Sequence, residues 1–414
     1  MAYPSTLNWE YRTTGNNLNA GMFDPSLGGT DYSQQDAAQV AYTDLVIGAT
    51  NTQLTSATTP FTAAMVGNGI AVASGTGFTV QRAYILSVAA GVATMDRAMG
   101  TANSTGGVGK LGGALALMTD ALLELVVAGN MVWIKAGTYT LSGSTTIAAD
   151  GTAALPVDII GYNATRGDNP TGASRPILAG ASLSISFNGN YWNFNHIRFS
   201  SYSSTGACAV SFARIVNCYA ENTSGSVRSA FVTNANYPAT YIDCEGVSAA
   251  GSAFYHTTAG YVTSLLWCYA HDSPYGFNAN GNNSNTLFSV FDTCTYGLYI
   301  NSAIHTALNN TFYSAVAGSG IYAPTTMGQQ SYIANNIFNM THASGVGVNY
   351  VDAVIRSISG GYNNFYACGT DRTNFPALTG DNDIDPQFVD APNGDFTTGS
   401  NVADTGRGIT LGVG

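Results

Sequence analysis

A short phrase that returns along the chain limits the fold more than any other feature of the sequence. SAFVTN at 229, SAFYHT at 252, YGFNAN at 275, YGLYIN at 296, SGIYAP at 319 and VGVNYV at 346 follow one another at steps of 23, 23, 21, 23 and 27 residues. Repeats of about 20 to 30 residues built from short strands predict a solenoid, because one repeat alone cannot bury its apolar face. The repeats therefore have to stack on one another.

Two positions of the phrase carry this stacking, since the third residue is always apolar and the second is always small. The third residues are Phe231, Phe254, Phe277, Leu298, Ile321 and Val348, and the second residues are Ala230, Ala253, Gly276, Gly297, Gly320 and Gly347. Stacked strands lie about 4.8 Å apart, so the third residues predict an inward-facing apolar ladder. Glycine weakens a strand, and its return at the second position predicts a bend or the close approach of another group.

A second ladder precedes the phrase in IVNCYAEN, YIDCEGVS and LLWCYAHD. The aligned cysteines are Cys218, Cys244 and Cys268. We expect them to be reduced, buried and inward-facing, because six cysteines without CxxC pairs do not make a disulfide framework. With cysteine inward, strict alternation also turns Val216, Ile242 and Leu266 inward. LNNTFYS and IANNIFNM continue this register with asparagine, as ladders of stacked strands allow.

The repeat predicts an all-β chain dominated by a right-handed parallel β-helix of roughly eight to ten turns. We place it at residues 112–400, with a tail at 401–414. Residues 41–111 carry short alternating segments broken by Gly and Asn, which predicts a small β-rich domain. Residues 1–40 hold isolated aromatics and little apolar periodicity, which predicts an arm that does not fold alone.

The stretch 112–130 is the clearest helical pattern of the sequence. Its apolar residues at helical spacing are Leu115, Leu117, Leu122, Leu123 and Val126. The open end of a solenoid exposes its core and an unpaired sheet edge. We therefore expect a helix over 112–130 that caps the β-helix.

Composition excludes several classes of partner. Charged residues make up only 9% of the chain, and the formal net charge is -11. Binding to nucleic acid needs clustered Lys and Arg, so we expect no nucleic-acid partner. No apolar run reaches the ~18 to 20 residues that span a bilayer, and the N-terminus lacks a signal-peptide pattern, so we expect neither a membrane span nor secretion. No P-loop, dinucleotide motif or Ser-His-Asp grouping is present, and we expect no cofactor.

At this point two sets of residues resemble known families. GNMVWIKAGTYTL, the N-C and D-C rungs and the closing DNDIDPQFVDAPNGDFT resemble the pectin-lyase-like right-handed parallel β-helix over residues 112–400. The leader WEYRTTGNNLNAGMFDP with GTDYSQQDAAQ is similar to the N-termini of phage virion proteins of tail-spike or fibre type. This resemblance implies a homotrimer on a virus particle that binds host surface glycans and in some members cuts them.

The sequence departs from the pectate lyases, because no Asp cluster matches their calcium site and no Arg is placed as their base. We therefore expect a non-enzymatic structural protein of a phage virion, a tail spike, tail fibre or head decoration, made in the host cytoplasm. Its N-terminal arm would bind other virion proteins, and its β-helix would bind host glycans. The alternative is a polysaccharide depolymerase, either a glycoside hydrolase or a lyase, of a phage tail spike.

The depolymerase alternative has its own candidate residues on the cysteine-bearing strands. Asp243 and Glu245 stand at i and i+2, which on one strand is about 7 Å, within the range of inverting glycoside hydrolysis. The neighbouring rungs add Tyr219, Trp267 and Tyr269 as aromatic faces for sugar rings. A solvated face without a catalytic role is the other interpretation.

Three further patterns stay open. Tyr255, Tyr299 and Tyr322, the fourth residues of the phrase, face outward as a subunit interface, a glycan platform or a plain exposed stripe. His271-Asp272 is a titrating pair or a surface pair, whereas His196 and His256 are expected to be structural. The spacing of Asp381, Asp383 and Asp385 could hold calcium, but their Gly- and Pro-rich surroundings favour a capping loop, so we expect no metal site.

Overall fold

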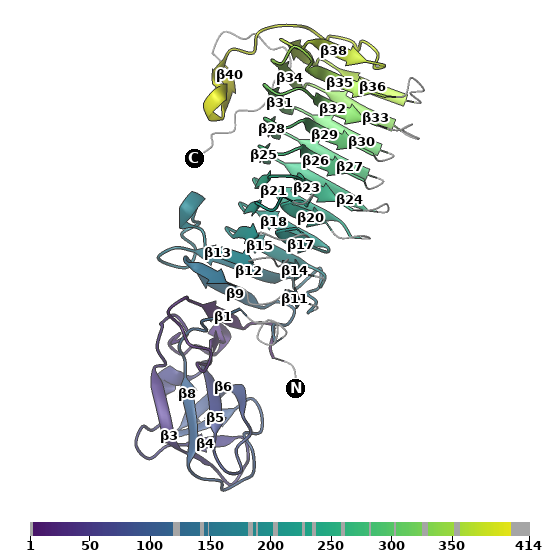
Figure 1. Cartoon of the computed structure of the whole chain (residues 1–414). Coiled ribbons are helices and arrows are strands. Elements are labelled where there is room, and N and C mark those ends of the chain that lie inside the picture. The colour runs from purple at the N-terminus through teal and green to yellow at the C-terminus, as the bar shows by residue number, and fades with distance from the viewer. Residues whose placement is uncertain are drawn as a thin grey trace. The chain divides into compact units, whose positions relative to one another are not determined.

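We describe the protein from a computed structural model. It describes residues 3–118, 125–140, 145–147, 149–180, 185–187, 189–201, 206–225, 228–233, 237–257, 261–280, 283–301, 304–324, 330–351 and 357–398. Strands dominate these residues (Figure 1). The described helices are single 3-10 turns at Pro25–Leu27, Ala63–Met65, Gly172–Ser174 and Ala391–Asn393. Within the described ranges, no helix is both long and apolar enough to cross a bilayer.

The chain divides into two compact units, and the larger one, residues 142–148 with 178–414, is a parallel β-helix. Three parallel sheets run along it, and each turn of the helix contributes one strand to each sheet. In this unit the first sheet contains β15 (Trp192–Asn195), β18 (Ala213–Val216), β21 (Ala239–Ile242), β24 (Val262–Leu266), β27 (Asn283–Leu287), β30 (Ile304–Leu308), β33 (Gln330–Ala334) and β36 (Ser357–Gly361).

The other two sheets follow the same order along the chain. The second contains β13 (Ile177–Gly180), β16 (Arg198–Ser201), β19 (Tyr219–Asn222), β22 (Glu245–Ser248), β25 (Tyr269–His271), β28 (Val290–Asp292), β31 (Thr311–Ser314), β34 (Ile337–Met340) and β37 (Asn364–Tyr366). The third contains β11 (Thr145–Ile147), β14 (Ile185–Phe187), β17 (Cys208–Val210), β20 (Phe231–Thr233), β23 (Ser252–His256), β26 (Tyr275–Ala279), β29 (Tyr296–Ile300), β32 (Ser319–Ala323), β35 (Val346–Tyr350) and β38 (Thr370–Thr373). The predicted all-β parallel β-helix is confirmed.

The recurring phrase forms the third sheet, and its predicted apolar ladder is confirmed. Phe231 pairs with Phe254, and the register continues through Phe277, Leu298, Ile321 and Val348, all of them fully buried. The small second residue has a steric cause. A Cβ on Gly276 would lie 2.5 Å from the ring of Phe291 and 2.6 Å from the carbonyl oxygen of Gly297. The phrase keeps glycine because the stacked phenylalanines of the second sheet occupy that space.

The corner between the first and second sheets breaks the alternation that the sequence suggested. Asn217, Asp243 and Trp267 have φ of 50°, 52° and 54°, in the left-handed region. The left-handed residue stands directly before each cysteine and ends the strand there, so the inward residues are Ile215, Tyr241 and Leu265. The prediction that Val216, Ile242 and Leu266 face inward was wrong, since these half-buried residues follow an inward one.

The cysteines themselves begin a buried ladder that changes residue type along the helix. Cys218, Cys244 and Cys268 are buried free thiols, as predicted. Cys268 N–H donates to Ser289 Oγ at 3.1 Å, and Ser289 N–H donates to Asn310 Oδ1 at 3.0 Å. In the same way, the backbone N–H groups of Asn310, Asn336 and Asn363 donate to the side-chain oxygens of Asn336, Asn363 and Asp381, respectively. The predicted asparagine register is therefore an internal hydrogen-bonded ladder.

The smaller unit, residues 1–141 with 149–177, contains a closed barrel. Its strands are β3 (Val40–Ile47), β4 (Gln53–Thr55), β5 (Gly69–Ser74), β6 (Gln81–Ala89), β7 (Val92–Met95) and β8 (Gly107–Leu111). The barrel thus occupies the segment expected to be β-rich. The unit also includes β1 (Asn8–Tyr11), β2 (Met22–Phe23), β9 (Met131–Lys135), β10 (Thr138–Thr140) and β12 (Val157–Tyr162). The division into units therefore falls beyond the predicted boundary at residue 111.

The N-terminal 40 residues are not a free arm. β1 pairs in parallel with β9, and Trp9 and Tyr11 are fully buried. Trp9 Nε1 donates to Asn130 Oδ1 at 3.1 Å. We predicted that this segment does not fold alone. It instead contributes strands to its own unit, and its aromatic residues Trp9 and Tyr11 pack in the core of that unit.

The predicted capping helix is absent from residues 112–118 and 125–130, whereas 119–124 lie outside the described residues. Leu115 instead pairs with Tyr11 in an isolated parallel bridge. Gly112 and Gly113 have φ of 65° and 73°, and a Cβ on either would lie 2.7 or 2.6 Å from side chains of residues 32 and 19. These glycines serve close packing, so the helical spacing of leucines was misleading.

A buried ionic network also holds this unit together. Glu10 is fully buried, and its carboxylate accepts hydrogen bonds from Tyr162 Oη, Arg12 Nε at 2.8 Å and Arg166 Nη2 at 2.7 Å. Arg166 also pairs with Asp31 at 2.8 Å. A buried carboxylate needs such partners, because removing one of them leaves an uncompensated charge.

Candidate functional site

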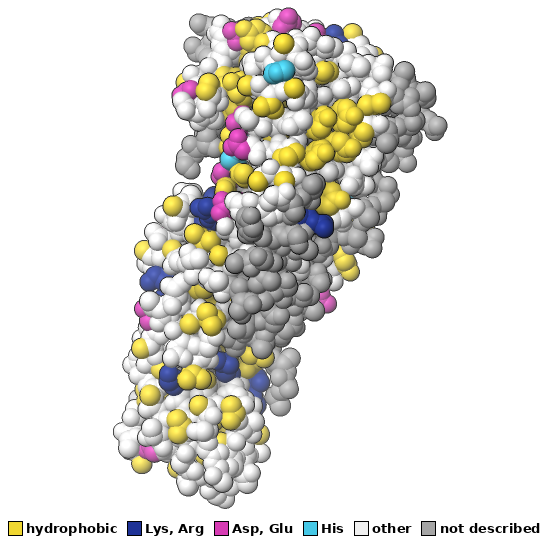
Figure 2. Space-filling model, viewed as in Figure 1, with side chains coloured by type: hydrophobic (Ala, Val, Ile, Leu, Met, Phe, Trp, Pro, Cys, Tyr) yellow, Lys and Arg dark blue, Asp and Glu magenta, His cyan; other side chains and the backbone are white. Residues whose placement is uncertain are grey.

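The outer face of the second sheet carries a group of neighbouring ionisable side chains. Two columns of outward residues run across β16, β19, β22, β25 and β28. The first column is Arg198, Tyr219, Glu245, Tyr269 and Val290, and the second is Ser200, Glu221, Val247, His271 and Asp292. Figure 2 shows acidic side chains (magenta) gathered beside a histidine (cyan) on the visible surface. In a chain with 9% charged residues, such a grouping is a candidate site.

Five of these residues form what we call the His271 cluster: Glu245, Tyr269, His271, Asp272 and Asp292. His271 Nε2 lies 3.1 Å from Glu245 Oε1, and its Nδ1 lies 2.9 Å from Asp272 Oδ2. The imidazole stacks on the ring of Tyr269 at 4.5 Å. Tyr269 Oη donates to Asp292 Oδ2 at 2.8 Å. His271 and Asp292 are also register partners on adjacent strands.

Burial and hydrogen bonding have opposite effects on the pKa values of Asp292 and His271. Burial raises the pKa of Asp292, and the hydrogen bonds from Thr293 and Tyr269 only partly oppose it. For His271, burial disfavours the imidazolium, but hydrogen bonds to Glu245 and Asp272 outweigh it and raise the pKa. The cluster therefore holds a carboxyl that keeps its proton to higher pH beside a histidine that keeps its charge to higher pH.

A neighbouring group, the Glu221 cluster, consists of Arg198, Ser200, Tyr219 and Glu221. Glu221 accepts hydrogen bonds from Ser200 Oγ at 2.6 Å, Arg198 Nη2 at 2.9 Å and Tyr219 Oη at 2.9 Å. Burial opposes ionisation of Glu221, but these three donors together lower its pKa. The Arg198 guanidinium also lies 4.7 Å from the Tyr219 ring centre. The two clusters thus place a stabilised carboxylate and a protonatable one on the same face.

The C-terminal hairpin of β39 (Phe388–Asp390) and β40 (Asp395–Thr398) borders the His271 cluster. Phe396 and Ala391 pack with Val290 in a small apolar core that Tyr269 and Tyr313 join. The ring of Tyr313 lies 5.5 Å from that of Phe396. Because Tyr269 belongs to both groups, the hairpin contributes to the dry surroundings of Asp292.

The structure separates the two carboxylates that the sequence paired. Glu245 begins β22 and lies between Tyr219 and Tyr269, as the register predicted. Asp243 instead lies in the left-handed corner before β22 and is exposed. The i and i+2 spacing of one strand therefore does not apply to them. Asp243 has no side-chain hydrogen bond to any residue that the structure describes, and nothing there removes its carboxyl from water.

The predicted aromatic residues lie in or beside the His271 cluster, on two turns of the β-helix. Tyr219 and Tyr269 stand in the same column as Glu245, on either side of it. Trp267 lies at the corner, 40% exposed, and stacks on Phe288 at 5.8 Å. Flat, partly exposed aromatic rings beside hydrogen-bonding groups match the needs of a sugar ring.

The tyrosines expected at an interface lie on the outer face of the third sheet. Tyr255, Asn278, Tyr299 and Tyr322 are register neighbours, as the sequence indicated. Sequence reasoning missed that the first residue of the phrase also faces outward, which adds Tyr275 and Tyr296. The glycine after each of them interrupts the two-residue alternation. That glycine was the signal that could have revealed them.

Asp292 is the functional candidate that sequence reasoning missed. It follows Phe291 in VFDTCT, and only the register of β28 with β25 places it opposite His271. The histidines expected to be structural behave as such, since His256 is fully buried and burial lowers its pKa.

The acidic tail caps the internal ladder. Asp381 accepts from the side chain of Asn363 at 3.1 Å and pairs with Arg372 at 2.9 Å. Asp385 accepts from the N–H of Gln387 at 2.8 Å. Across the described part of the chain, no group of three or more His, Cys, Asp or Glu residues is arranged to hold a metal ion.

Comparisons with known proteins return similar structures and no family. No family model matches the chain, and no curated protein gives a significant match. A pectate lyase (Pel9A) is 16% identical, with a TM-score of 0.44 over 73% of this chain and 85% of the lyase. An alginate lyase from Paenibacillus sp. str. FPU-7 is 14% identical, with a TM-score of 0.40 over 64% of this chain and 94% of that one.

A rhamnogalacturonan lyase is 14% identical, with a TM-score of 0.40 over 72% of this chain and 92% of the lyase. These activities are those of the three proteins so named. The assignment of this chain as a β-helix comes from its own strand pairing.

Proposed function

We propose that this protein is a polysaccharide depolymerase whose site is the His271 cluster. The observation that carries the proposal is the place of Asp292, opposite His271 and hydrogen-bonded by Tyr269 on a face lined by aromatic rings. Burial raises the pKa of Asp292 and so favours its protonated form, which can donate a proton to a leaving glycosidic oxygen. The similar solved structures named above carry activities of this kind, but the proposal rests on this chain's own residues.

Each member of the cluster has a distinct task in this proposal. Asp292 donates its proton to the leaving oxygen as the glycosidic bond breaks. Glu245, held by His271 at 3.1 Å, is the base that removes a proton from the attacking water or from a sugar carbon. Tyr269 orients Asp292 through its hydrogen bond, and the charged His271 offsets the negative charge of the surrounding carboxylates.

The choice between water and a sugar carbon as the proton source decides the reaction. If Glu245 activates water, the products are two saturated ends and the reaction is hydrolysis. If it removes a proton from the sugar ring, the bond breaks by elimination and one product carries a double bond. Ultraviolet absorbance of the product distinguishes elimination from hydrolysis, and both release new reducing ends.

The sugar chain would lie across the rungs rather than along one strand. Tyr269 and Trp267 stand on one turn and Tyr219 stands two turns away, with about 4.8 Å between neighbouring turns. The C-terminal hairpin closes the surface beyond β28, so the chain approaches from the side of β16.

The test is release of reducing ends from a panel of acidic and neutral polysaccharides. Asp292→Asn should reduce the rate about 10²- to 10⁴-fold, the usual contribution of a general acid, with little change in melting temperature. Asp243→Asn is the matched control and should keep the wild-type rate. No release from any polysaccharide by the wild-type protein would refute the proposal, as would an equal effect of the two variants.

The second candidate is the non-enzymatic structural protein of a phage virion. The uncharged tyrosines of the third sheet favour it, because aromatic side chains are enriched in subunit interfaces and would suit a homotrimer. Attachment to other virion proteins would then need a surface other than the first 40 residues' aromatics, since Trp9, Tyr11 and Phe23 are buried. A sedimentation mass that stays that of a trimer when the protein is diluted, together with no cleavage of any polysaccharide, would favour this candidate.

A further inference from the structure

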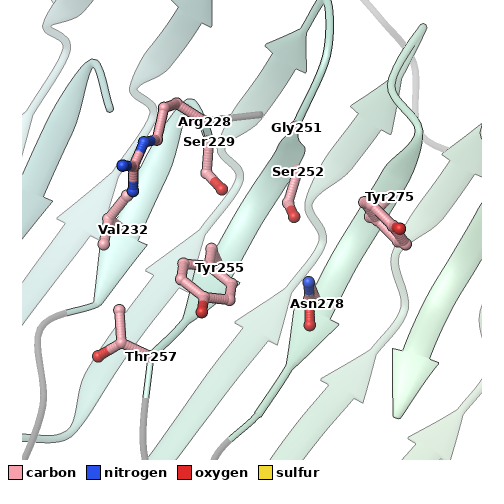
Figure 3. A pocket seen from close by; sticks show the side chains of 9 residues that line it. All are labelled: Arg228, Ser229, Val232, Gly251, Ser252, Tyr255, Thr257, Tyr275 and Asn278. Carbon is pink, nitrogen blue, oxygen red and sulfur yellow. The ribbon is translucent and has the colours of Figure 1, made fainter. Parts of the chain in front are cut away.

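A pocket opens on the outer face of the third sheet, away from the residues of the His271 cluster. Its volume is 290 Å³, near the lower end for small-molecule sites. Figure 3 shows Tyr255 in the middle, Tyr275 on one side and Arg228 on the other, with Asn278 between the tyrosines. The hydroxyls of Ser229 and Ser252 line the same space. The walls therefore alternate aromatic rings with hydrogen-bonding groups.

Two polar groups of this pocket lack side-chain partners among the described residues. Asn278 Oδ1 is shielded from water without a hydrogen bond. The guanidinium of Arg228 has no ion pair or hydrogen bond with any side chain of the described residues. Buried polar atoms are nearly always hydrogen-bonded, so an unpaired oxygen in a pocket wall points to a ligand that donates to it. A sugar hydroxyl is such a donor.

A row of tyrosines leads out of the pocket along the same face. Tyr275 stacks on Tyr296 at 5.6 Å, and Tyr296 stacks on Tyr322 at 4.5 Å. Tyr299 lies beside them, 5.5 Å from Tyr322. The row extends the pocket into a longer platform of rings.

We propose that the pocket and the tyrosine row bind an oligosaccharide that carries an anionic group, with the anion at Arg228. The pocket holds one sugar ring, whose hydroxyls donate to Asn278 Oδ1. Successive rings lie on Tyr275, Tyr296 and Tyr322. Arg228 pairs with the anion through its planar fork, a geometry suited to carboxylate and to sulfate.

The charge of the chain argues for a saccharide rather than a nucleic acid. A phosphate backbone needs several cations to displace its counterions, and Arg228 is the one cation among the described residues that line the pocket. The chain carries a net charge of -11, so a polyanion meets general repulsion. A single Arg in a polar aromatic pocket therefore selects one anionic group within a mostly neutral contact.

Calorimetric titration of the full-length protein with tetrasaccharides tests this inference. The probes are a neutral 1,4-linked glucan, a 1,4-linked uronic acid oligomer and a sulfated glucan of the same length. We expect the anionic probes to bind at least about tenfold more tightly than the neutral one, and the better of the two identifies carboxylate or sulfate. Equal affinity for all three probes, or no binding, would overturn the proposal.

Variants at one position separate charge from geometry. Arg228→Gln should lower affinity for the preferred anionic probe about tenfold and leave that for the neutral probe unchanged, whereas Arg228→Lys should keep part of the preference. Arg214→Gln is the matched control, because Arg214 is exposed on β18 of the first sheet. An equal loss in the Arg214 variant would show nonspecific attraction and would also overturn the proposal.

The tyrosine row as a subunit interface is the competing outcome. Sedimentation of Tyr299→Arg alongside the wild type decides it, since a charge inserted into an interface dissociates the oligomer. A wild-type oligomer that this variant splits, together with no saccharide binding, would refute the site. The inference does not depend on cleavage, because binding that persists in Asp292→Asn supports this pocket whether or not the His271 cluster is catalytic.

Discussion

The outer faces of the second and third sheets are built by the same turns of one solenoid, yet they carry different chemistry. Between β16 and β28 the second sheet presents Arg198, Glu221, Glu245, His271 and Asp292. Between β23 and β32 the third sheet presents Tyr255, Tyr275, Asn278, Tyr296, Tyr299 and Tyr322. Packing does not require this difference, because both sets point away from the core.

The difference teaches where this fold leaves the sequence free. Inward positions repeat because each turn has to match its neighbours in shape, as Phe254 does with Phe277. Outward positions have no such restraint and vary from turn to turn. A run of outward residues that share one chemistry across several turns is therefore better evidence of function than any inward ladder.

The largest expected effect separates the interior from the faces. Phe277→Ala removes a fully buried ring from the stacked ladder and should lower the free energy of unfolding by about 3–5 kcal/mol. Tyr299 follows Leu298, the register partner of Phe277, but faces outward, so Tyr299→Ala should cost less than half as much. Denaturant unfolding followed by circular dichroism measures both. Equal losses would mean that the outer tyrosines are structural and that the comparison fails.

The internal ladder should come next in size. Asn336 donates to Asn363 Oδ1 at 3.0 Å and accepts from Asn310 Nδ2 at 3.1 Å, all within the core. Asn336→Ala leaves both neighbours with unmet buried hydrogen-bonding groups and should cost about 1–3 kcal/mol. Asn349→Ala, on the outer face of β35, is the matched control and should change stability little. A neutral Asn336→Ala would show that water enters the ladder.

Sequence reasoning succeeded where a residue's role depends on its own repeat. The apolar ladder of the third sheet, the buried cysteines and the asparagine register all follow from spacing, because the neighbour in space lies one repeat away. The same logic placed Glu245 between Tyr219 and Tyr269.

It failed where the backbone left the regular pattern. Asp243 and Trp267 adopt left-handed conformations, which only the hydrogen bonds of the stacked corners impose, so alternation could not be carried through them. The leucines at 115 and 117 had helical spacing, but Leu115 pairs with a strand from the other end of its unit. Burial raises the pKa of Asp292 against the opposing hydrogen bonds of Thr293 and Tyr269, and its local sequence does not reveal that burial.

A smaller effect tests whether the C-terminal hairpin shields Asp292, on the outer face of the second sheet, from water. Replacing Phe388 and Phe396 by alanine should loosen the hairpin that packs over Val290 and Tyr313. More water around Asp292 would lower its pKa toward the ordinary value for aspartate, because burial is the main cause of its rise. Carboxyl titration by NMR measures the change, with Glu221 as the internal control. An unaltered Asp292 pKa would mean that β25 and β28 alone set its environment.

The smallest effect concerns Glu221, the carboxylate on the second sheet that already accepts three hydrogen bonds. The pKa of Glu221 is lowered in the folded protein, so its contribution to stability is present above the ordinary glutamate pKa, about 4.3, and is lost as the pH falls through the folded value. Glu221→Gln should therefore be less stable than the wild type at neutral pH. We expect a loss of about 1 kcal/mol or less, because solvent screens this partly exposed group.

That deficit should vanish in acid, and its disappearance is the informative part of the measurement. Melting temperatures of Glu221→Gln and the wild type should converge as the pH falls below the folded pKa, whereas Asp243→Asn should follow the wild type at every pH because its carboxylate has no partner among the described side chains. A deficit that persists in acid would assign the stabilisation to packing. Convergence would show that Glu221 and Arg198 serve stability, leaving Glu245, His271 and Asp292 as the ionisable groups of this face that stability does not explain.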